Sequence, residues 1–134
     1  MGETVKQENN LPKPIILNAF DMNCAGHINH GLWTHPRDES YRFNELRYWT
    51  GLAKTLEQGL FDGLFLADIT GCYDVYQHNI DVTLKESVQL PSHDPTTLVS
   101  AMASVTEHLG FGITVNLSYE TPYQFARRMA SLDP

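Results

Sequence analysis

The chain has 134 residues, 42% of them hydrophobic, and a formal net charge of −7, with 9 Lys and Arg against 16 Asp and Glu. This length gives one domain of ordinary size, and the composition is that of a globular protein. The acidic balance argues against nucleic acid as a partner, because phosphate binding needs clustered Lys and Arg. Two cysteines are too few for a disulfide framework, and no apolar run approaches the roughly 20 residues that span a bilayer. We therefore expect a cytoplasmic protein without membrane association.

The N-terminal third of the chain divides into a polar leader, a strand and a long loop. Residues 1–14 are polar and contain two prolines, which predicts a flexible leader before a single domain over residues 15–134. Ile15 to Phe20 have the apolar, β-branched pattern of a buried strand. The segment from Asn18 to Pro36 combines three Asn, one Asp, one Cys and three His with five large apolar side chains. A long polar connection that also carries apolar surface is typical of a structured site loop.

The middle of the chain predicts a helix, a second strand and a second long connection. Residues 44–58 have apolar side chains at helical spacing, and Gly59 follows them as a stop. Asp62 to Asp68 contain a second buried strand that ends on a carboxylate. Residues 69–93 are rich in polar and aromatic side chains and form the second connection.

The last third predicts two helices around a third strand. Asp94 caps a helix that has Pro95 at its first position, and Gly110 closes it. Residues 111–116 form the third strand, and Thr121 opens a further helix with capping-box spacing. Strand, loop and helix thus alternate three times. This alternation predicts an α/β fold with parallel strands in the order 1-2-3, right-handed crossovers and helices on one side.

Polar side chains cluster where each predicted strand ends. They are Asp21 and Asn23 after the first strand, Asp68 at the second, and Asn116 and Ser118 after the third. Ligands of α/β folds bind at the carboxyl ends of the strands, so we expect one site there. Two alternatives stay open from the residues alone. Asp68 is either a cap or a ligand contact, and Thr114 and Asn116 also fit strand packing and a turn cap.

Metal and nucleotide motifs receive little support. Cys24-x2-His27-x2-His30-x4-His35 has the ligand types of a zinc site, but this spacing matches none of the common zinc patterns. We expect no metal, because hydrogen-bonding and substrate-contact roles are commoner for histidines in loops. The phosphate-cradling patterns GxGxxG and GxxxxGK[ST] are absent from the sequence, so a Rossmann or P-loop site has no support.

Five segments of the chain together carry a family resemblance. In order they are NAFDMNCAGHINHGLWTHPRD, YWTGLAKTLEQGLFDGLFLAD, YDVY, DPTTLVSAMASVTEHLGFG and SYETPYQFARRMASLD. They resemble the N-terminal part of the bacterial-luciferase-like, FMN-dependent monooxygenases grouped with nitrilotriacetate and dibenzothiophene-sulfone monooxygenases. The AFDMNCAGH block is most similar to the long-chain alkane monooxygenase branch. The resemblance covers residues 15–133.

The resemblance implies a fold, a chemistry and a set of residues. The fold is a (β/α)8 TIM barrel, which binds reduced FMN supplied by a separate flavin reductase, activates O2 and acts on a small apolar substrate such as a long-chain alkane. By position in the family motifs, Asp68 and Thr114 match FMN contacts. Asn116 stands where relatives have Ser or Thr beside the flavin. Cys24 and His27 match residues of the catalytic pocket.

The chain departs from the family after SLD, where relatives continue and this sequence reads Pro134 and stops. A (β/α)8 barrel needs about 200 residues or more, so we expect the first three βα units of a truncated barrel. Two hypotheses follow: a flavin-dependent monooxygenase that is incomplete as a 134-residue chain, or a non-catalytic truncated remnant. A flavodoxin-like binding protein is a weaker third, because it needs about five strands. An open parallel sheet has exposed edges, so a homo-oligomer also stays open.

Overall fold

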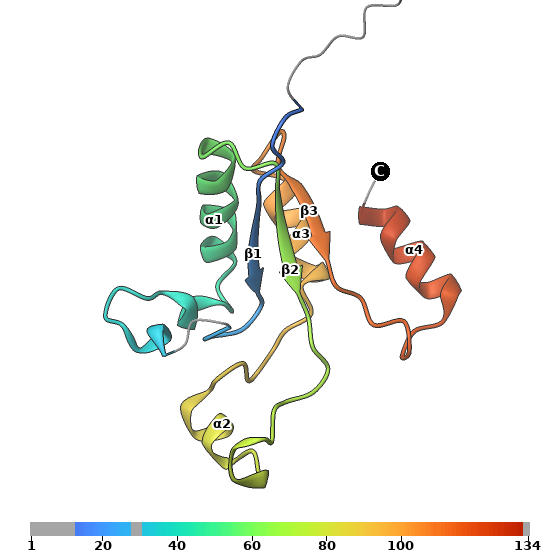
Figure 1. Cartoon of the computed structure of the whole chain (residues 1–134). Helices are drawn as coiled ribbons and strands as arrows, with labels where there is room; N and C mark the ends of the chain where they lie inside the picture. The colour runs from blue at the N-terminus through green and yellow to red at the C-terminus, as the bar shows by residue number, and fades with distance from the viewer. Residues whose placement is uncertain (1–12, 28–30, 133–134) are drawn as a thin grey trace, which may run out of the picture.

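The protein, described by a computed structural model over residues 13–27 and 31–132, is built on a three-stranded parallel sheet. The strands are β1 (Asn18–Met22), β2 (Gly63–Ala67) and β3 (Gly110–Ile113), in the order β1-β2-β3 (Figure 1). Both strand pairs are parallel, which confirms the predicted strand order and direction. The predicted leader lies almost wholly outside the described residues.

The helices occupy three places around the sheet. Helices α1 and α3 cover one face, α2 lies beyond the carboxyl ends of the strands, and α4 stands beside β3 (Figure 1). Short 3-10 turns lie in the connections between strands and helices. The α-helices are α1 (Leu46–Gln58), α2 (Asp81–Glu86), α3 (Thr96–Ala103) and α4 (Pro122–Leu132), and the 3-10 turns are Leu32–Thr34, Ser40–Arg42 and Tyr76–His78.

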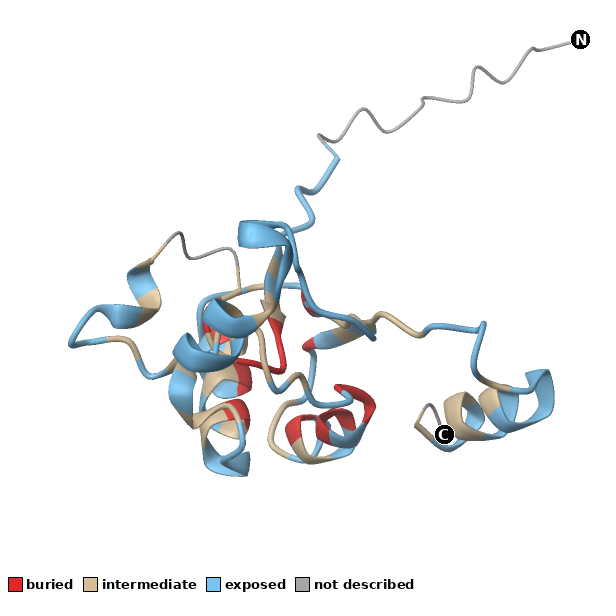
Figure 2. Cartoon of the chain, turned by 90° about the horizontal axis from the view of Figure 1, so that it is seen from below, coloured by how far each residue is buried: buried red, intermediate tan, exposed pale blue. Residues whose placement is uncertain are grey.

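The hydrophobic core lies between the sheet and the α1–α3 pair, where the buried residues gather (Figure 2). Side chains on β2 alternate, so Leu64 and Leu66 face the helices while Phe65 points to the opposite face. Trp49 of α1 is 1% exposed, and its indole nitrogen donates to the Phe43 carbonyl oxygen at 2.6 Å. Buried indoles need such a partner, so this bond lets the largest side chain of the core pack without an unsatisfied donor. The core residues are Trp49, Ala53, Leu56, Leu64, Leu66, Leu98, Met102 and Leu109.

The first strand differs from its prediction in both position and burial. β1 begins at Asn18, and Ile15 and Ile16 are 89% and 72% exposed instead of buried. The reason is that β2 begins only at Gly63, opposite Asn18, so among the described residues no strand or helix lies beside Ile15 and Ile16 for them to pack against. The next residue, Leu17, is held at the edge of the sheet, because its backbone N–H donates to the Asp62 carboxylate at 2.7 Å.

The helix after Asp94 is shorter than predicted, and a tertiary contact holds the residues that follow it in a non-helical connection. Asp94 does cap α3, since its carboxylate accepts the Thr96 backbone N–H at 2.9 Å. The helix ends at Ala103, and Gly110 opens β3 instead of closing a helix. One carboxylate oxygen of Glu57 accepts the backbone N–H groups of three consecutive residues at 2.6–3.1 Å, and these bonds lower the Glu57 pKa. The three donors are Glu107, His108 and Leu109.

The sheet face opposite the helices is open and aromatic. Phe20 and Phe65 are 50% and 39% exposed, and their rings stack with centroids 5.6 Å apart. Gly112 on β3 leaves room for this arrangement, because a Cβ there would lie 3.1 Å from the Phe65 ring. Parallel sheets usually have both faces covered, so this face is suited to contact with further structure.

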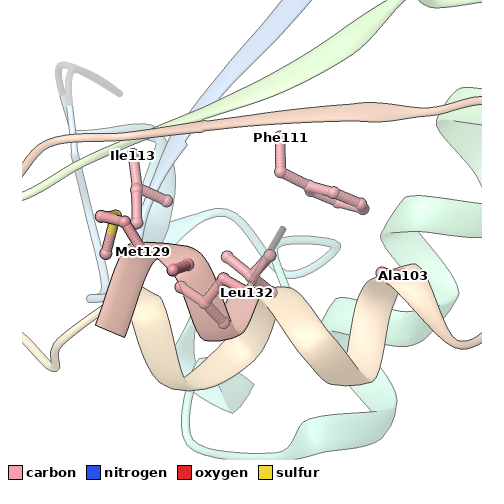
Figure 3. Close-up of a pocket in the computed structure, with 7 residues that line it drawn as sticks. Ala103, Phe111, Ile113, Met129 and Leu132 are labelled. Atoms are coloured by element: carbon pink, nitrogen blue, oxygen red, sulfur yellow. The ribbon is translucent and has the colours of Figure 1, made fainter. Parts of the chain in front are cut away.

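An apolar hollow lies between α4 and the rest of the fold. It measures about 760 Å³ and lies between α3, β3 and α4 (Figure 3). None of the side chains on α4 is buried. Helix α4 is tied to the preceding loop by an ion pair between Arg128 and Glu120 at 2.6 Å. The hollow is lined by Val99, Ala103, Phe111, Ile113, Met129, Ala130 and Leu132.

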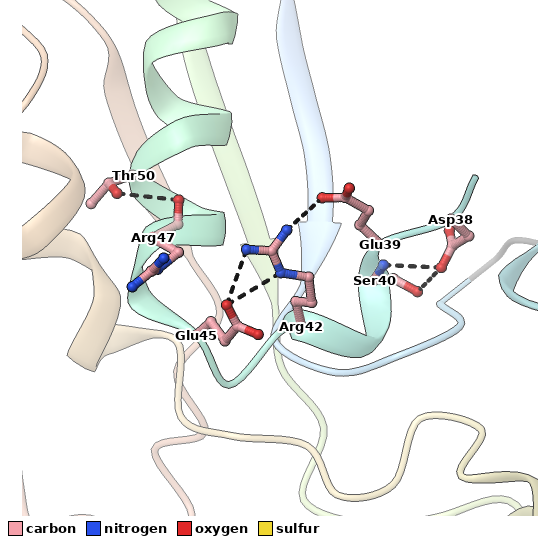
Figure 4. A network of polar contacts seen from close by, with 7 residues as sticks. All are labelled: Asp38, Glu39, Ser40, Arg42, Glu45, Arg47 and Thr50. Atoms are coloured by element: carbon pink, nitrogen blue, oxygen red, sulfur yellow. Dashed lines mark hydrogen bonds and ion pairs between the residues drawn. The ribbon is translucent and has the colours of Figure 1, made fainter. Parts of the chain in front are cut away.

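The loop before α1 is held by a small polar network (Figure 4). The Arg42 guanidinium contacts the carboxylates of Glu39 and Glu45 at 2.9 Å and 3.0 Å. The two carboxylate side chains are 61% and 44% exposed, so this network contributes little to stability.

Candidate functional site

The loop after β1 and the connection after β2 are joined by backbone hydrogen bonds. The Gln89 N–H donates to the Ala25 carbonyl oxygen at 2.9 Å, and the His93 N–H donates to the Asn23 carbonyl oxygen at 2.9 Å. Residues distant in the sequence thereby meet at the carboxyl ends of the first two strands. Asn23 is 1% exposed, and its side-chain oxygen has no hydrogen-bond partner among the described residues.

A glycine turns the first of these loops toward the sheet. Gly26 has φ +81°, and a Cβ there would lie 3.2 Å from the Trp33 ring. Both the backbone conformation and the close ring favour glycine at this position. The next residue, His27, contacts the open sheet face, with its ring centroid 5.2 Å from that of Phe20.

His27 is held by a residue that sequence reasoning missed. Its Nδ1 lies 2.8 Å from Nε2 of Gln89, which is 62 positions further along the chain. Burial lowers the His27 pKa, so the ring is neutral at neutral pH. Nε2 of the ring is buried and has no partner among the described residues. No local pattern signals such a pairing, because it depends on the two loops being brought together.

Cys24 is buried beneath the site, with 3% of its surface exposed. Burial, with a smaller effect of the nearby Asp21 carboxylate, raises the pKa of the thiol to about 11. The thiol is therefore neutral at neutral pH and behaves as a small apolar group.

We expect the two cysteines to react with thiol reagents at very different rates. A pKa of about 11 instead of 9.0 lowers the thiolate fraction of Cys24 about 100-fold, and burial slows it further. Cys72 is exposed. Iodoacetamide labelling at pH 8, followed by peptide mass spectrometry, should modify Cys72 at least about 100-fold faster than Cys24. Comparable rates in the folded chain would contradict this burial, and unfolding in urea should make the rates equal.

A polar hollow of about 180 Å³ lies at the carboxyl ends of β2 and β3. Asp68, Thr114 and Asn116 all line it, and they also line a neighbouring hollow of about 570 Å³. The sequence therefore located this convergence of side chains. Cys24, which the resemblance places in the catalytic pocket, is not among the residues that line either hollow. The smaller hollow is completed by Thr70, Asp94, Thr96, Val115, Tyr119, Glu120 and Arg128.

The electrostatics of this hollow are set by carboxylates. Burial raises the pKa of Asp68, the Ile69 N–H bond opposes this, and the Asp94 carboxylate raises it further. The Arg128 guanidinium is already paired with Glu120, so it offers little net positive charge. The hydroxyl, amide and carboxylate groups that line the hollow suit a neutral ligand that both donates and accepts hydrogen bonds. An anionic phosphate would be repelled there.

Metal binding has no geometric support within the part of the chain that the structure describes. No group of three or more His, Cys, Asp or Glu side chains is placed to hold an ion among residues 13–27 and 31–132. His30 of the predicted loop lies outside the described residues, so the absence of zinc stays a prediction. Within the same ranges, no helix is long and apolar enough to cross a membrane.

Comparison with known proteins decides the family. The model of the luciferase-like monooxygenase family matches residues 22–134. This chain belongs to the luciferase-like monooxygenase family. It is 54% identical over 123 residues to the long-chain alkane monooxygenase of Geobacillus thermodenitrificans, covering 92% of this chain and 28% of that protein. It is 49% identical over 123 residues to the dimethyl-sulfide monooxygenase of Hyphomicrobium sulfonivorans, covering 92% of this chain and 26% of that protein.

Solved structures of similar proteins confirm the arrangement of the elements. A long-chain alkane monooxygenase superposes with a TM-score of 0.88 at 54% identity, covering 92% of this chain and 28% of that one. A riboflavin lyase, solved with modified FMN and riboflavin, superposes with a TM-score of 0.82 at 35% identity, covering 90% and 27%. The chain therefore spans about a quarter of the length of these relatives.

Proposed function

We propose that this chain forms the first three βα units of a flavin-dependent monooxygenase barrel. In that barrel, reduced FMN from a separate flavin reductase and O2 would oxidise a small apolar substrate such as a long-chain alkane. Family membership supports the reaction class. The observation that carries the assignment is the convergence of Asp68, Thr114 and Asn116 on one hollow at the strand ends. A relative named nitrilotriacetate monooxygenase component A, 33% identical over 119 residues, supports a system of two components.

The polar hollow fits part of FMN. The amide-like edge of the flavin ring and the ribityl hydroxyls both donate and accept hydrogen bonds, as do the groups around Asp68, Thr114 and Asn116. The flavin phosphate does not fit among the carboxylates there, so it would be held elsewhere in a complete barrel. When bound, reduced FMN supplies the electrons that activate O2.

Cys24 and His27 have different proposed roles in the catalytic pocket. The neutral thiol of Cys24 would form part of a dry wall, since its burial disfavours the thiolate. His27, neutral and next to Phe20, would offer a hydrogen-bonding nitrogen at the open sheet face. Both roles concern binding and water exclusion.

A non-catalytic remnant is the second candidate. The observation that favours it is the open aromatic face, where Phe20 and Phe65 remain half-exposed in this chain. A site with that face uncovered has no wall to exclude water, and a remnant could keep only a residual binding role.

Flavin titration tests the proposed contacts. We expect riboflavin and FMN to bind the chain weakly and with similar affinity, because the hollow fits the ring edge and ribityl chain. Amide shifts in two-dimensional NMR should change around Asp68, Thr114 and Asn116. Asp68→Ala should weaken binding about tenfold, the effect of removing one hydrogen-bonding carboxylate. Asp74→Ala, which removes an exposed carboxylate outside the hollow, is the matched control. Shift changes confined to other surfaces would refute the assignment.

A further inference from the structure

Gln89 is fixed on two sides at the point where it meets His27. Its backbone N–H donates to the Ala25 carbonyl oxygen at 2.9 Å, and its backbone has φ +56°. Its side-chain Nε2 lies 2.8 Å from Nδ1 of His27. The backbone bond anchors the residue independently of its amide, so the side chain can be changed while the junction of the two loops is kept.

This contact selects one form of the imidazole. The structure places the amide nitrogen of Gln89 toward Nδ1 of His27. Because an amide nitrogen only donates hydrogen bonds, this orientation requires Nδ1 to accept and to carry no proton. In the neutral ring the proton then sits on Nε2. That nitrogen is buried and without a hydrogen-bond partner among the described residues. A buried N–H without a partner is costly, which favours a ligand atom that accepts its hydrogen bond.

We propose that Gln89 is a positioning residue that fixes His27 as the Nε2–H tautomer and directs this N–H to an acceptor atom of a bound ligand. The ligand class is a neutral or anionic group with an oxygen or nitrogen lone pair. Phe20 limits ring rotation on the side of the open sheet face, with its centroid 5.2 Å away. The inference rests on the proposed function only because it treats the surroundings of His27 as the part of the site that binds substrate.

The tautomer can be measured in the 134-residue chain without any flavin. Long-range ¹H–¹⁵N correlation spectra distinguish a protonated from an unprotonated ring nitrogen. We expect His27 to be protonated on Nε2 with at least about a tenfold excess over the other tautomer, as one amide hydrogen bond would produce. Gln89→Glu replaces the donor by a carboxylate acceptor and should move a proton onto Nδ1. Gln77→Glu, a matched change at another positive-φ glutamine in the same connection, should leave His27 unchanged.

Two results would overturn the proposal. One is a wild-type spectrum with the proton on Nδ1, which would mean that the Gln89 amide faces the ring with its oxygen. The other is a His27 spectrum that Gln89→Glu and Gln89→Leu leave unaltered in folded protein, as judged by circular dichroism. Neither result bears on flavin contacts at Asp68, so failure here and failure of the proposed function are separable.

Discussion

The isolated 134-residue chain is expected to form no hydroxylated product when supplied with reduced FMN, a flavin reductase, NADH and a panel of alkanes. Oxygen transfer by reduced flavin needs a site from which water is excluded. Here the aromatic face bearing Phe20 and Phe65 is half-exposed. The polar hollow is lined by carboxylates, and its Arg128 is already paired with Glu120, so the hollow suits the flavin phosphate poorly. Flavin reduced by the added reductase would then react with O2 unproductively in solvent.

Gas chromatography of the reaction mixture measures this outcome against a reductase-only control. A second arm adds a polypeptide corresponding to the part of the Geobacillus thermodenitrificans relative that this chain does not match. If that polypeptide covers the open face and the edge of β3, product should appear only in the mixture of both chains. Reproducible product from the 134-residue chain alone, above the control, would show that the open face does not prevent catalysis.

Trp49→Ala should abolish cooperative folding. The side chain is 1% exposed at the centre of the α1–sheet–α3 core. Truncating a buried tryptophan costs about 3–5 kcal/mol, a large share of the roughly 5–15 kcal/mol that stabilises a typical domain. The variant also leaves the Phe43 carbonyl oxygen without its 2.6 Å donor. A small sheet with one open face has little reserve, so we expect loss of the urea transition at 25 °C.

Two variants make this result interpretable. Trp49→Phe keeps an aromatic ring in the core but removes the hydrogen bond and part of the buried ring volume, so it should lose about 1–3 kcal/mol and still unfold cooperatively. Tyr123→Ala removes an aromatic ring that is 77% exposed on α4 and should leave the free energy of unfolding within about 0.5 kcal/mol of wild type. A cooperative transition of unchanged midpoint in Trp49→Ala would contradict the described core.

Local signals in the sequence were enough to predict much of the fold. Helix α1 begins within two residues of its predicted start and ends at the predicted residue, because apolar spacing and Gly59 act over single turns. The capping carboxylate of Asp94 and the hydroxyl of Thr121, which accepts the Gln124 N–H at 3.4 Å, were also predictable. The position of Asp68 and Asn116 at one edge followed from parallel alternation, since parallel strands present their carboxyl ends together. Thr114 was singled out by the family resemblance.

Tertiary structure decided the features that depend on partners far along the chain. Glu57 binds the backbone N–H groups of residues 107–109, some 50 positions away, in the connection between α3 and β3, and no helix signal encodes that. Ile15 and Ile16 have strand-like character but lie beyond the start of β2, so their burial depended on a neighbour that is not there. Gln89 meets His27 only because two loops are joined at the strand ends. Spacing and capping act within one or two turns, whereas these contacts exist only once the sheet has brought its loops together.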